Sequence, residues 1–502
     1  MTSATLQPAD ASGADSGALD PAQSTQPGKS AARFSGTTIR HWAVLAAIIV
    51  VALGVRWYFI DRQTMDYQAF LSRWYATLDE GGFSAFKQQF ADYNYPYLYL
   101  IWLLTVLNVP SLVGIKAISI VFDFVLAFFA YRIVALRTER FSLRALAFGV
   151  MLLLPSVIAN SAYWGQADGI YSAMAMGGIY FLLRAARTDI THRSYVINSV
   201  WACVFFGLSL SFKLQAVFVL PVLVWLLLRG RLPWYSLLAI PAVFVAAVIP
   251  AVIAGAPWSE ALSVYLNQTG SYKQLTLGAA NLYQLIPIAG DATWLAHLGI
   301  GLAAAVIVGF LAWSVWKRPP VTPATILVVA TASAAIVPFL LPAMHDRYFY
   351  TAEVLSVVMA FYLPLRFVLI PILIQAAAIG VYHSSLSGDQ GQGFGGGGGG
   401  RPNGGGGGGP QQSGAAQGAA PTNPGQGGPG GQNGQGGQGG QGGSRGQGGG
   451  MPGGGRGSSE GYTSGRGDTA LQIYAGMMGL AVLSLVYAVV DTFRRAWPAR
   501  RA

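Results

Sequence analysis

The chain has 502 residues, of which 53% are hydrophobic and 10% charged, and its formal net charge is +11. Its apolar runs reach the ~18 residues that cross the hydrocarbon of a bilayer, which excludes an ordinary soluble protein and predicts a multi-pass membrane protein. The positive charge does not indicate a nucleic-acid partner, because cytoplasmic loops of membrane proteins collect Lys and Arg. The single cysteine, Cys203, excludes an intramolecular disulfide and a cysteine metal site.

Hydropathy predicts an all-α polytopic bundle of about 12 transmembrane helices. Residues 1–41 are small and polar, without the apolar stretch of a cleavable signal peptide, so we expect a disordered cytoplasmic tail there. The segment 96–109 is apolar but too short to cross comfortably, and we expect a re-entrant or interfacial helix that ends at Pro110. The expected spans are 42–60, 112–136, 145–160, 169–184, 195–211, 214–228, 234–254, 295–316, 322–341, 351–365, 367–383 and 469–492.

Basic residues predict the orientation of these spans in the cytoplasmic membrane. With both termini in the cytoplasm, most of the 31 Lys and Arg residues fall on cytoplasmic segments, as the positive-inside pattern requires. This orientation holds only if 96–109 does not cross the bilayer. The residues on that side include Arg40, Arg132, Arg137, Arg140, Arg144, Arg184, Arg187, Arg193, Arg229, Arg231, Lys317, Arg318, Arg366, Arg494 and Arg495.

The chain divides into a membrane domain, a glycine-rich insert and one last span. We expect the membrane domain over 42–383, with a helical first extracytoplasmic loop at 61–95. Residues 384–467 are mostly Gly with Gln, Pro, Asn and Ser, which predicts a disordered extracytoplasmic loop. A tether, a wall-spanning spacer or a low-complexity expansion would each explain it, and we assign it no chemistry. The final span is 468–493, followed by a basic cytoplasmic tail at 494–502.

Polar residues collect in separate stretches on the predicted extracytoplasmic side. Each of these residues has a simple structural explanation when it is considered by itself. Asp168 would cap a helix, Lys213 would extend its ammonium group to the membrane interface, and Trp164 would belong to the belt of aromatic residues at that interface. Together they predict one polar pocket, because ionisable groups near a membrane are costly and usually face a cavity or a pathway. The stretches are TMDYQAFLSRW and ADYNYPYLYL in the first loop (Asp66, Arg73, Asp92, Tyr93), NSAYWGQADGIY (Trp164, Gln166, Asp168), SFKLQAVF (Lys213, Gln215), the loop 255–294, and LPAMHDRYFY (His345, Asp346, Arg347, Tyr348).

This mixture of carboxylates and cations fits glycosyl transfer from a lipid-linked sugar. A lipid phosphate is bound by Arg, Lys or His, and sugar hydroxyls are held by carboxylates, amides and aromatic faces. Transfer to an acceptor hydroxyl needs a carboxylate base near the acceptor proton. Nearby cations would stabilise the departing phosphate.

At these residues the chain resembles the GT-C superfamily of membrane glycosyltransferases. It is similar to bacterial relatives of the GPI-anchor mannosyltransferases and to the glucosyltransferases that use dolichyl-phosphate glucose. The resemblance covers roughly 42–383. Its motifs are MDYQAFLSRW, DYNYPYLYL, WGQADGIY, SFKLQAVFVLP and MHDRYFY, the last with Asp346 and Arg347 where the glucosyltransferases commonly have Glu and Lys.

The resemblance implies an inverting hexosyltransferase with a polyprenyl-phosphate sugar as donor and an extracytoplasmic glycan, lipid or protein as acceptor. Asp66 would be the general base, and His345 and Arg347 would face the donor phosphate or the acceptor. The GPI-anchor enzymes often carry a His-Pro-Asp-Glu type motif where this chain has only Asp66, so mannose and glucose both remain open. No cofactor or metal is expected, although the carboxylates could hold a divalent ion. The remaining donor or acceptor residues would be Arg73, Asp92, Tyr93, Trp164, Gln166, Asp168, Lys213, Gln215, Asp346 and Tyr348.

Two other classes of protein remain open. A flippase or other membrane transporter would also gather ionisable groups around a cavity. Such proteins usually carry internal repeats with broken helices at mid-membrane, and this sequence shows no clear repeat. A membrane acyltransferase would use His345 as its base and leave Asp66 without a role.

Overall fold

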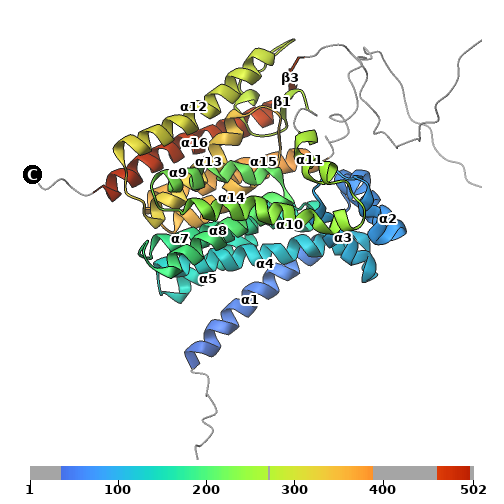
Figure 1. Cartoon of the computed structure of the whole chain (residues 1–502), viewed down its shortest axis with the longest axis horizontal. Coiled ribbons are helices and arrows are strands. Elements are labelled where there is room, and N and C mark those ends of the chain that lie inside the picture. The colour runs from blue at the N-terminus through green and yellow to red at the C-terminus, as the bar shows by residue number, and fades with distance from the viewer. Residues whose placement is uncertain (1–35, 269–271, 388–460, 498–502) are drawn as a thin grey trace, which may run out of the picture.

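A computed structural model of the chain describes residues 36–268, 272–387 and 461–497. Its long helices lie side by side in an elongated bundle, and short helices gather at one end (Figure 1). The helices of the bundle are α1 Gly36–Phe59, α4 Ser111–Arg137, α5 Phe141–Leu153, α7 Asp168–Ala186, α8 Arg193–Phe212, α9 Pro221–Leu228, α10 Ala239–Ile253, α12 Thr293–Lys317, α13 Pro323–Leu340, α14 Tyr350–Ala360, α15 Leu369–Leu386 and α16 Thr469–Ala496.

Each of the predicted spans falls on one of these helices, so the all-α polytopic prediction is confirmed. Within the described residues, 8 helices are long and apolar enough to cross a membrane. A ninth span forms if α5 counts with the segment Pro155–Trp164, which continues it after a bend of 45°. The other three predicted spans fall on α7, on the segment Leu214–Leu228 that includes α9, and on α14, which are shorter or less apolar.

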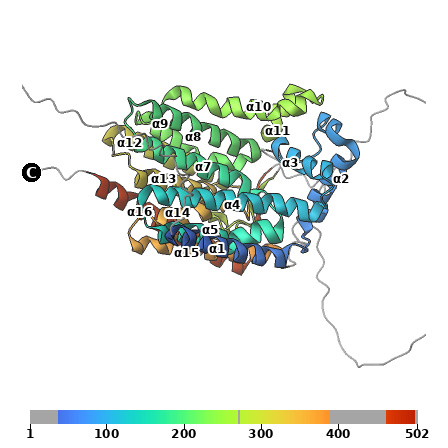
Figure 2. The ribbon, with the colours of Figure 1, turned by 90° about the horizontal axis from the view of Figure 1, so that it is seen from below.

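Two of the helices that do not qualify as spans on their own, α7 and α14, lie inside the bundle, and the apolar helix α1 lies at its edge. Nearly all of α7 and α14 is buried, whereas α1 is largely exposed and diverges from its neighbours (Figure 1). Figure 2 shows α10 along one edge of the bundle, with α1 and α15 at the opposite edge. Because α7 and α14 expose little surface to hydrocarbon, they can be less apolar or shorter than a helix that faces lipid.

Glycine allows α7 and α8 to pack closely at the centre of the bundle. A Cβ atom at Gly177 would lie 2.5 Å from the ring of Phe205, and one at Gly178 would lie 2.7 Å from the ring of Phe206. Small residues commonly permit such approaches between membrane helices. The close contact brings the first turn of α7 near the last turn of α8, where two of the predicted site residues stand.

The first loop is helical, as predicted. It contains η1 Tyr67–Leu71, α2 Ser72–Gly81 and η2 Gly82–Lys87, and α3 Tyr95–Val106 follows. Helix α3 has 12 residues, which is about 18 Å at 1.5 Å per residue and too short to cross the hydrocarbon. It packs against α2, α4, α8 and α10 at the end of the bundle that also carries α11 Trp258–Gln268 (Figure 1).

A small parallel sheet at this end was not predicted. Strand β1 Gln274–Leu277 lies between β2 Met344–His345 and β3 Thr463–Arg466. The prediction of disorder over 384–467 is therefore wrong at both ends of the insert, because α15 continues to Leu386 and β3 joins the sheet. Residues 388–460, like the predicted tails at 1–35 and 498–502, lie outside the described residues.

Candidate functional site

Asp66 stands at the start of η1, and one of its carboxylate oxygens is held by three donors. Trp164 Nε1 donates to Asp66 Oδ2 at 2.9 Å, and Gln166 Nε2 donates to the same oxygen at 2.7 Å. The third donor is Arg347 Nη1, at 3.2 Å. The side chain of Asp66 is 22% exposed. No described residue bonds the other oxygen, Oδ1, so Asp66 is fixed in orientation and keeps one oxygen for a ligand.

Arg347, the last residue of the sequence HDR at 345–347, lies close to three carboxylates. Besides Asp66, its Nε lies 3.6 Å from Asp346 Oδ1 and 3.9 Å from Asp168 Oδ2. Its guanidinium also stacks over the ring of Trp164, 4.8 Å from the centroid. Burial opposes the charge on Arg347, but Asp66 and Asp346 outweigh it and raise the pKa of the guanidinium. This arginine is therefore a permanent cation at the centre of the site.

Asp168 and Lys213 form the second ion pair of the site. Lys213 directly follows α8, and its Nζ lies 2.5 Å from Asp168 Oδ1 at the start of α7. Asn160 Nδ2 donates to Asp168 Oδ2 at 2.9 Å. Burial lowers the pKa of Lys213, and the Asp168 carboxylate opposes that effect. We call Asp66, Asp168, Asp346, Lys213 and Arg347 the outer cluster.

Aromatic and amide side chains border the outer cluster. The ammonium of Lys213 lies 4.6 Å from the ring centroid of Tyr93. The hydroxyl of Tyr93 donates to Gln166 Oε1 at 3.1 Å. Gln215, at the start of the segment after Lys213, lies beside Tyr348, and its buried Oε1 has no hydrogen-bond partner among the described residues. These groups can bind sugar hydroxyls and the face of a sugar ring.

His345 is held in its neutral form. Burial and the neighbouring cations Arg347 and Lys213 lower the pKa of its imidazole to about 3. The ring packs against the rings of Tyr272 and Tyr348, with centroids 4.9 Å and 5.2 Å away. A neutral imidazole can donate or accept a hydrogen bond but brings no positive charge to a phosphate. A pKa this low also makes His345 a weak base, which does not favour the acyltransferase alternative.

The structure does not bring every predicted residue to the same place. Asp346 belongs to the site: Ser385 Oγ donates to its Oδ2 at 2.7 Å, and burial raises the pKa of its carboxyl. Asp92 is exposed at the edge, near Tyr93 and Tyr272. Arg73 is exposed on α2 and forms no ion pair with the described residues, so its predicted place in the pocket is not supported.

Sequence reasoning missed the polar groups that support the outer cluster. Asn160 and Ser385 orient two carboxylates, yet both occur in runs that read as ordinary helix. Arg466, at the end of β3, places its guanidinium near Asp346 and Gly278. Its position at the end of the glycine-rich stretch, directly before a predicted span, is the feature of the sequence that could have indicated this arginine.

A separate ion pair lies within the bundle. Arg56 on α1 binds Asp123 on α4, with 2.8 Å between Arg56 Nη2 and Asp123 Oδ2, and Ser161 donates to the same oxygen at 2.5 Å. The two charged side chains are 1% and 0% exposed. We call Arg56 and Asp123 the inner pair. Neither residue was singled out from the sequence, because a lone charge in a span shows no partner.

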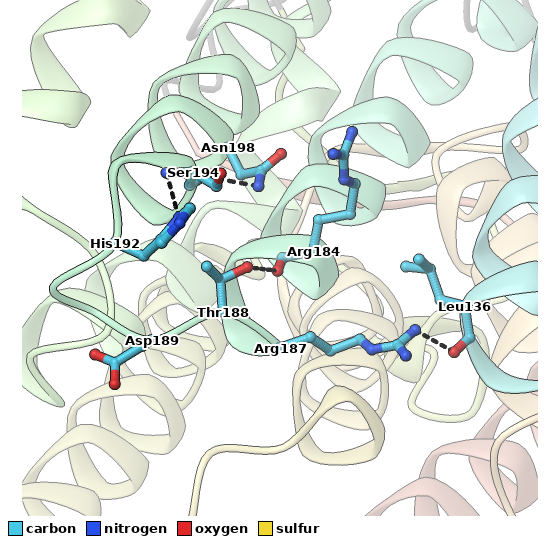
Figure 3. Close-up of a pocket in the computed structure, with 8 residues that line it drawn as sticks. All are labelled: Leu136, Arg184, Arg187, Thr188, Asp189, His192, Ser194 and Asn198. Atoms are coloured by element: carbon cyan, nitrogen blue, oxygen red, sulfur yellow. Dashed lines mark hydrogen bonds between the residues drawn. The ribbon is translucent and has the colours of Figure 1, made fainter. Parts of the chain in front are cut away.

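A hollow at the opposite end of α7 is distinct from the outer cluster (Figure 3). Its volume is about 490 Å³, and it contains none of the predicted site residues. Arg187 donates to the carbonyl of Leu136, and Asp189 Oδ1 accepts from the backbone of Thr191. Its lining residues are Leu136, Arg184, Arg187, Thr188, Asp189, His192, Ser194 and Asn198. Two of the arginines assigned to the cytoplasmic side, Arg184 and Arg187, line it, without a matching set of reactive groups.

Within the described residues, no group of three His, Cys, Asp or Glu side chains has the arrangement of a metal site. The carboxylates of the outer cluster are instead neutralised by Arg347 and Lys213. The expectation of a metal-independent enzyme stays a prediction.

No protein-family model matches the chain, and no curated protein matches it. A solved structure that is similar is the crystal structure of ArnT from Cupriavidus metallidurans bound to undecaprenyl phosphate, with a TM-score of 0.45 and 15% sequence identity. The similarity covers 68% of this chain and 65% of that chain, so it extends over less than two thirds of the other protein's length.

Proposed function

We propose that this protein is an inverting glycosyltransferase of the GT-C type. It moves a hexose from a polyprenyl-phosphate sugar to an acceptor hydroxyl at the extracytoplasmic face of the membrane. The observation that carries the proposal is the convergence of Asp66, Arg347 and Lys213, from three distant parts of the sequence, at one end of the bundle. The sequence motifs that resemble this superfamily supply those same residues.

Asp66 is the general base of the proposed reaction. Its Oδ2 is occupied by three donors, which leaves Oδ1 to take the proton of the acceptor hydroxyl. As that proton moves to Asp66, the acceptor oxygen attacks C1 of the hexose from the face opposite the phosphate. The bond between C1 and the phosphate oxygen breaks, and the polyprenyl phosphate leaves with the bonding electrons. A single displacement of this kind inverts the anomeric carbon.

The leaving phosphate is stabilised by fixed positive charge and hydrogen bonds. Arg347 presents a guanidinium that matches phosphate oxygens, and Lys213 adds a compact ammonium. Neutral His345 supplies a hydrogen bond to the phosphate rather than a charge. In this low-dielectric site, such groups stabilise the charge of the leaving phosphate more strongly than they would in water.

The remaining polar groups hold the sugar. Tyr93 and Tyr348 offer aromatic faces, and Gln215 offers a buried acceptor that has no partner among the described residues. Asp346 and Gln166 add acceptors at the border of the site. These groups suit a hexose, and the choice between mannose and glucose is left to experiment.

The proposed orientation places this site outside the cytoplasm. Arg137 donates to the carbonyl of Tyr362, Arg229 to the carbonyl of Pro319, and Arg366 pairs with Asp491, all at the opposite ends of the helices that carry the site. Basic groups at one end and the outer cluster at the other agree with the positive-inside orientation. Both termini are then cytoplasmic.

The proposal is tested with purified protein in liposomes that contain labelled polyprenyl-phosphate mannose or polyprenyl-phosphate glucose. Label transferred to an added envelope extract, with release of polyprenyl phosphate, supports the enzyme and identifies the sugar. Asp66→Asn is the matched control, because it keeps the size of the side chain but cannot accept the proton. Labelled lipid that crosses the bilayer with its sugar intact, equally in both proteins, would instead establish the flippase alternative.

A further inference from the structure

Both cations of the outer cluster are already paired with carboxylates. Lys213 is already paired with Asp168 at 2.5 Å, and Arg347 is shared among Asp66, Asp168 and Asp346. Three carboxylates outnumber two cations, and His345 is neutral. With these groups ionised the cluster is net negative, so a lipid phosphate that binds there shares Arg347 and Lys213 with the carboxylates.

The parallel sheet brings one more cation to this site. Leu277 of β1 is in register with His345 of β2 on one side and with Arg466 of β3 on the other. Side chains at matched positions of paired strands lie on the same face of a sheet. Two strand spacings of about 4.8 Å separate the backbones of His345 and Arg466, roughly 10 Å in all, which an arginine side chain can bridge with a bound phosphate.

Arg466 is placed next to the outer cluster but is not neutralised by it. Its Nη2 donates to the carbonyl of Ser384 at 3.1 Å, and the neighbouring Ser385 holds Asp346. A Cβ atom built on Gly278 would lie 3.7 Å from Arg466 Nη1 and 3.9 Å from Asp346 Cβ. Among the described residues no carboxylate oxygen lies within 4.0 Å of its guanidinium. The side chain is half-buried and keeps donors available.

Strand β3 is held to the sheet by contacts that depend on its glycine. Gly465 has a φ of +85°, and a Cβ atom there would lie 2.1 Å from the carbonyl oxygen of Thr276. Gln284 Nε2 donates to the carbonyl of Arg466 at 2.8 Å and to Thr276 Oγ1 at 3.1 Å. A larger residue at 465 would therefore separate β3 from β1 without removing the guanidinium of Arg466.

We propose that Arg466, at the C-terminal end of the glycine-rich insert, binds the phosphate of the polyprenyl-linked donor and of the released polyprenyl phosphate. The inference deepens the proposed function and rests on it. It assigns a role to a part of the insert for which the sequence analysis predicts no chemistry. The guanidinium adds a positive charge that the carboxylates of the outer cluster do not neutralise. Its main effect is therefore on donor binding, and its effect on the rate of transfer is smaller.

The test measures the binding of undecaprenyl phosphate to the full-length protein in nanodiscs. This ligand carries no sugar, so binding is separated from turnover. Arg466→Ala is expected to weaken binding roughly 10- to 100-fold, the range for losing a hydrogen bond to a charged group. Arg466→Lys should recover part of the loss, and Gly465→Val should weaken binding although Arg466 is present. In transfer assays Arg466→Ala should raise the donor KM and leave kcat nearly unchanged.

The controls separate this inference from the proposed function. Arg456→Ala removes another arginine of the same insert and should bind as the wild type does. If Arg347→Ala weakens binding while Arg466→Ala does not, the role of Arg466 is overturned and the proposed function stands. If the wild-type protein does not bind undecaprenyl phosphate, both are overturned. Thermal unfolding of each variant, unchanged from the wild type, shows that a binding loss is not a folding defect.

Discussion

Two arginine–aspartate pairs in this protein have the same chemistry but different surroundings. The inner pair joins α1 to α4, and its side chains are 1% and 0% exposed. In the outer cluster, Arg347 and Asp66 are 15% and 22% exposed, and Arg347 is shared among three carboxylates. A closed pair with one partner holds helices together, whereas an open cluster with competing partners can exchange one of them for a ligand. Burial and the number of partners therefore distinguish the inner pair from the pair that we propose to act in transfer.

The largest expected effect comes from Asp66→Asn in the outer cluster. The amide cannot take the acceptor proton, and loss of a general base typically costs ~10²–10⁴ in rate. The variant should insert into the membrane and unfold at the same temperature as the wild type, because Asp66 lies at the edge of the bundle. Transfer of labelled hexose in liposomes measures the first effect, and thermal unfolding in detergent measures the second. Wild-type turnover in this variant would remove Asp66 from the mechanism.

The inner pair should show the opposite pattern. Asp123→Ala leaves Arg56 buried without its counter-charge, which destabilises a protein by about 3–5 kcal/mol. The temperature of thermal unfolding in detergent should therefore fall strongly. A double variant that replaces both Arg56 and Asp123 by leucine should recover most of the stability, because two buried charges are then removed together. A stable single variant with lost transfer would mean that the inner pair takes part in the chemistry.

The protonation of His345 makes the stability of the protein depend on pH, which sharpens the comparison further. Its pKa in the folded protein is about 3, below the value near 6.5 expected in the unfolded chain. As the pH falls from 6.5 toward 3, the unfolded chain binds a proton at this position that the folded protein does not bind. The free energy of unfolding therefore falls over that range, and above pH 6.5 this contribution is fully present.

Replacing this imidazole tests the assignment directly. His345→Gln should remove that part of the acid destabilisation, which unfolding curves at a series of pH values would measure against the wild type. Between pH 6 and 8 the wild-type transfer rate should show no step from this residue. A kinetic step near pH 6.5 that disappears in His345→Gln would contradict a neutral imidazole in the site.

The smallest effect is expected from shortening the insert. Replacing residues 388–460 with a short Gly-Ser linker keeps α15, β3 and Arg466, so transfer should stay close to the wild-type rate. Extending the deletion through residue 467 removes β3 and should weaken donor use. Equal activity of the two deletions would show that β3 contributes nothing to the site.

Much of this molecule follows from local sequence. Apolar runs determine where helices form, because every backbone group in hydrocarbon must be bonded within its own segment. The spans, the helical first loop and the polar stretches that hold Asp66, Asp168, Lys213 and Arg347 are all visible in the sequence. Basic residues at alternate loops also indicate an orientation for the whole bundle.

Only the tertiary structure decided which polar groups meet. Arg347 binds Asp66 across 281 positions of sequence, and β3 reaches the site from the far side of a long insert. Exposed Arg73 stays outside the cluster, and the inner pair appears only when α1 packs on α4. Helix formation depends on neighbours a few residues apart, whereas charge pairing depends on distances in space that the packed helices set.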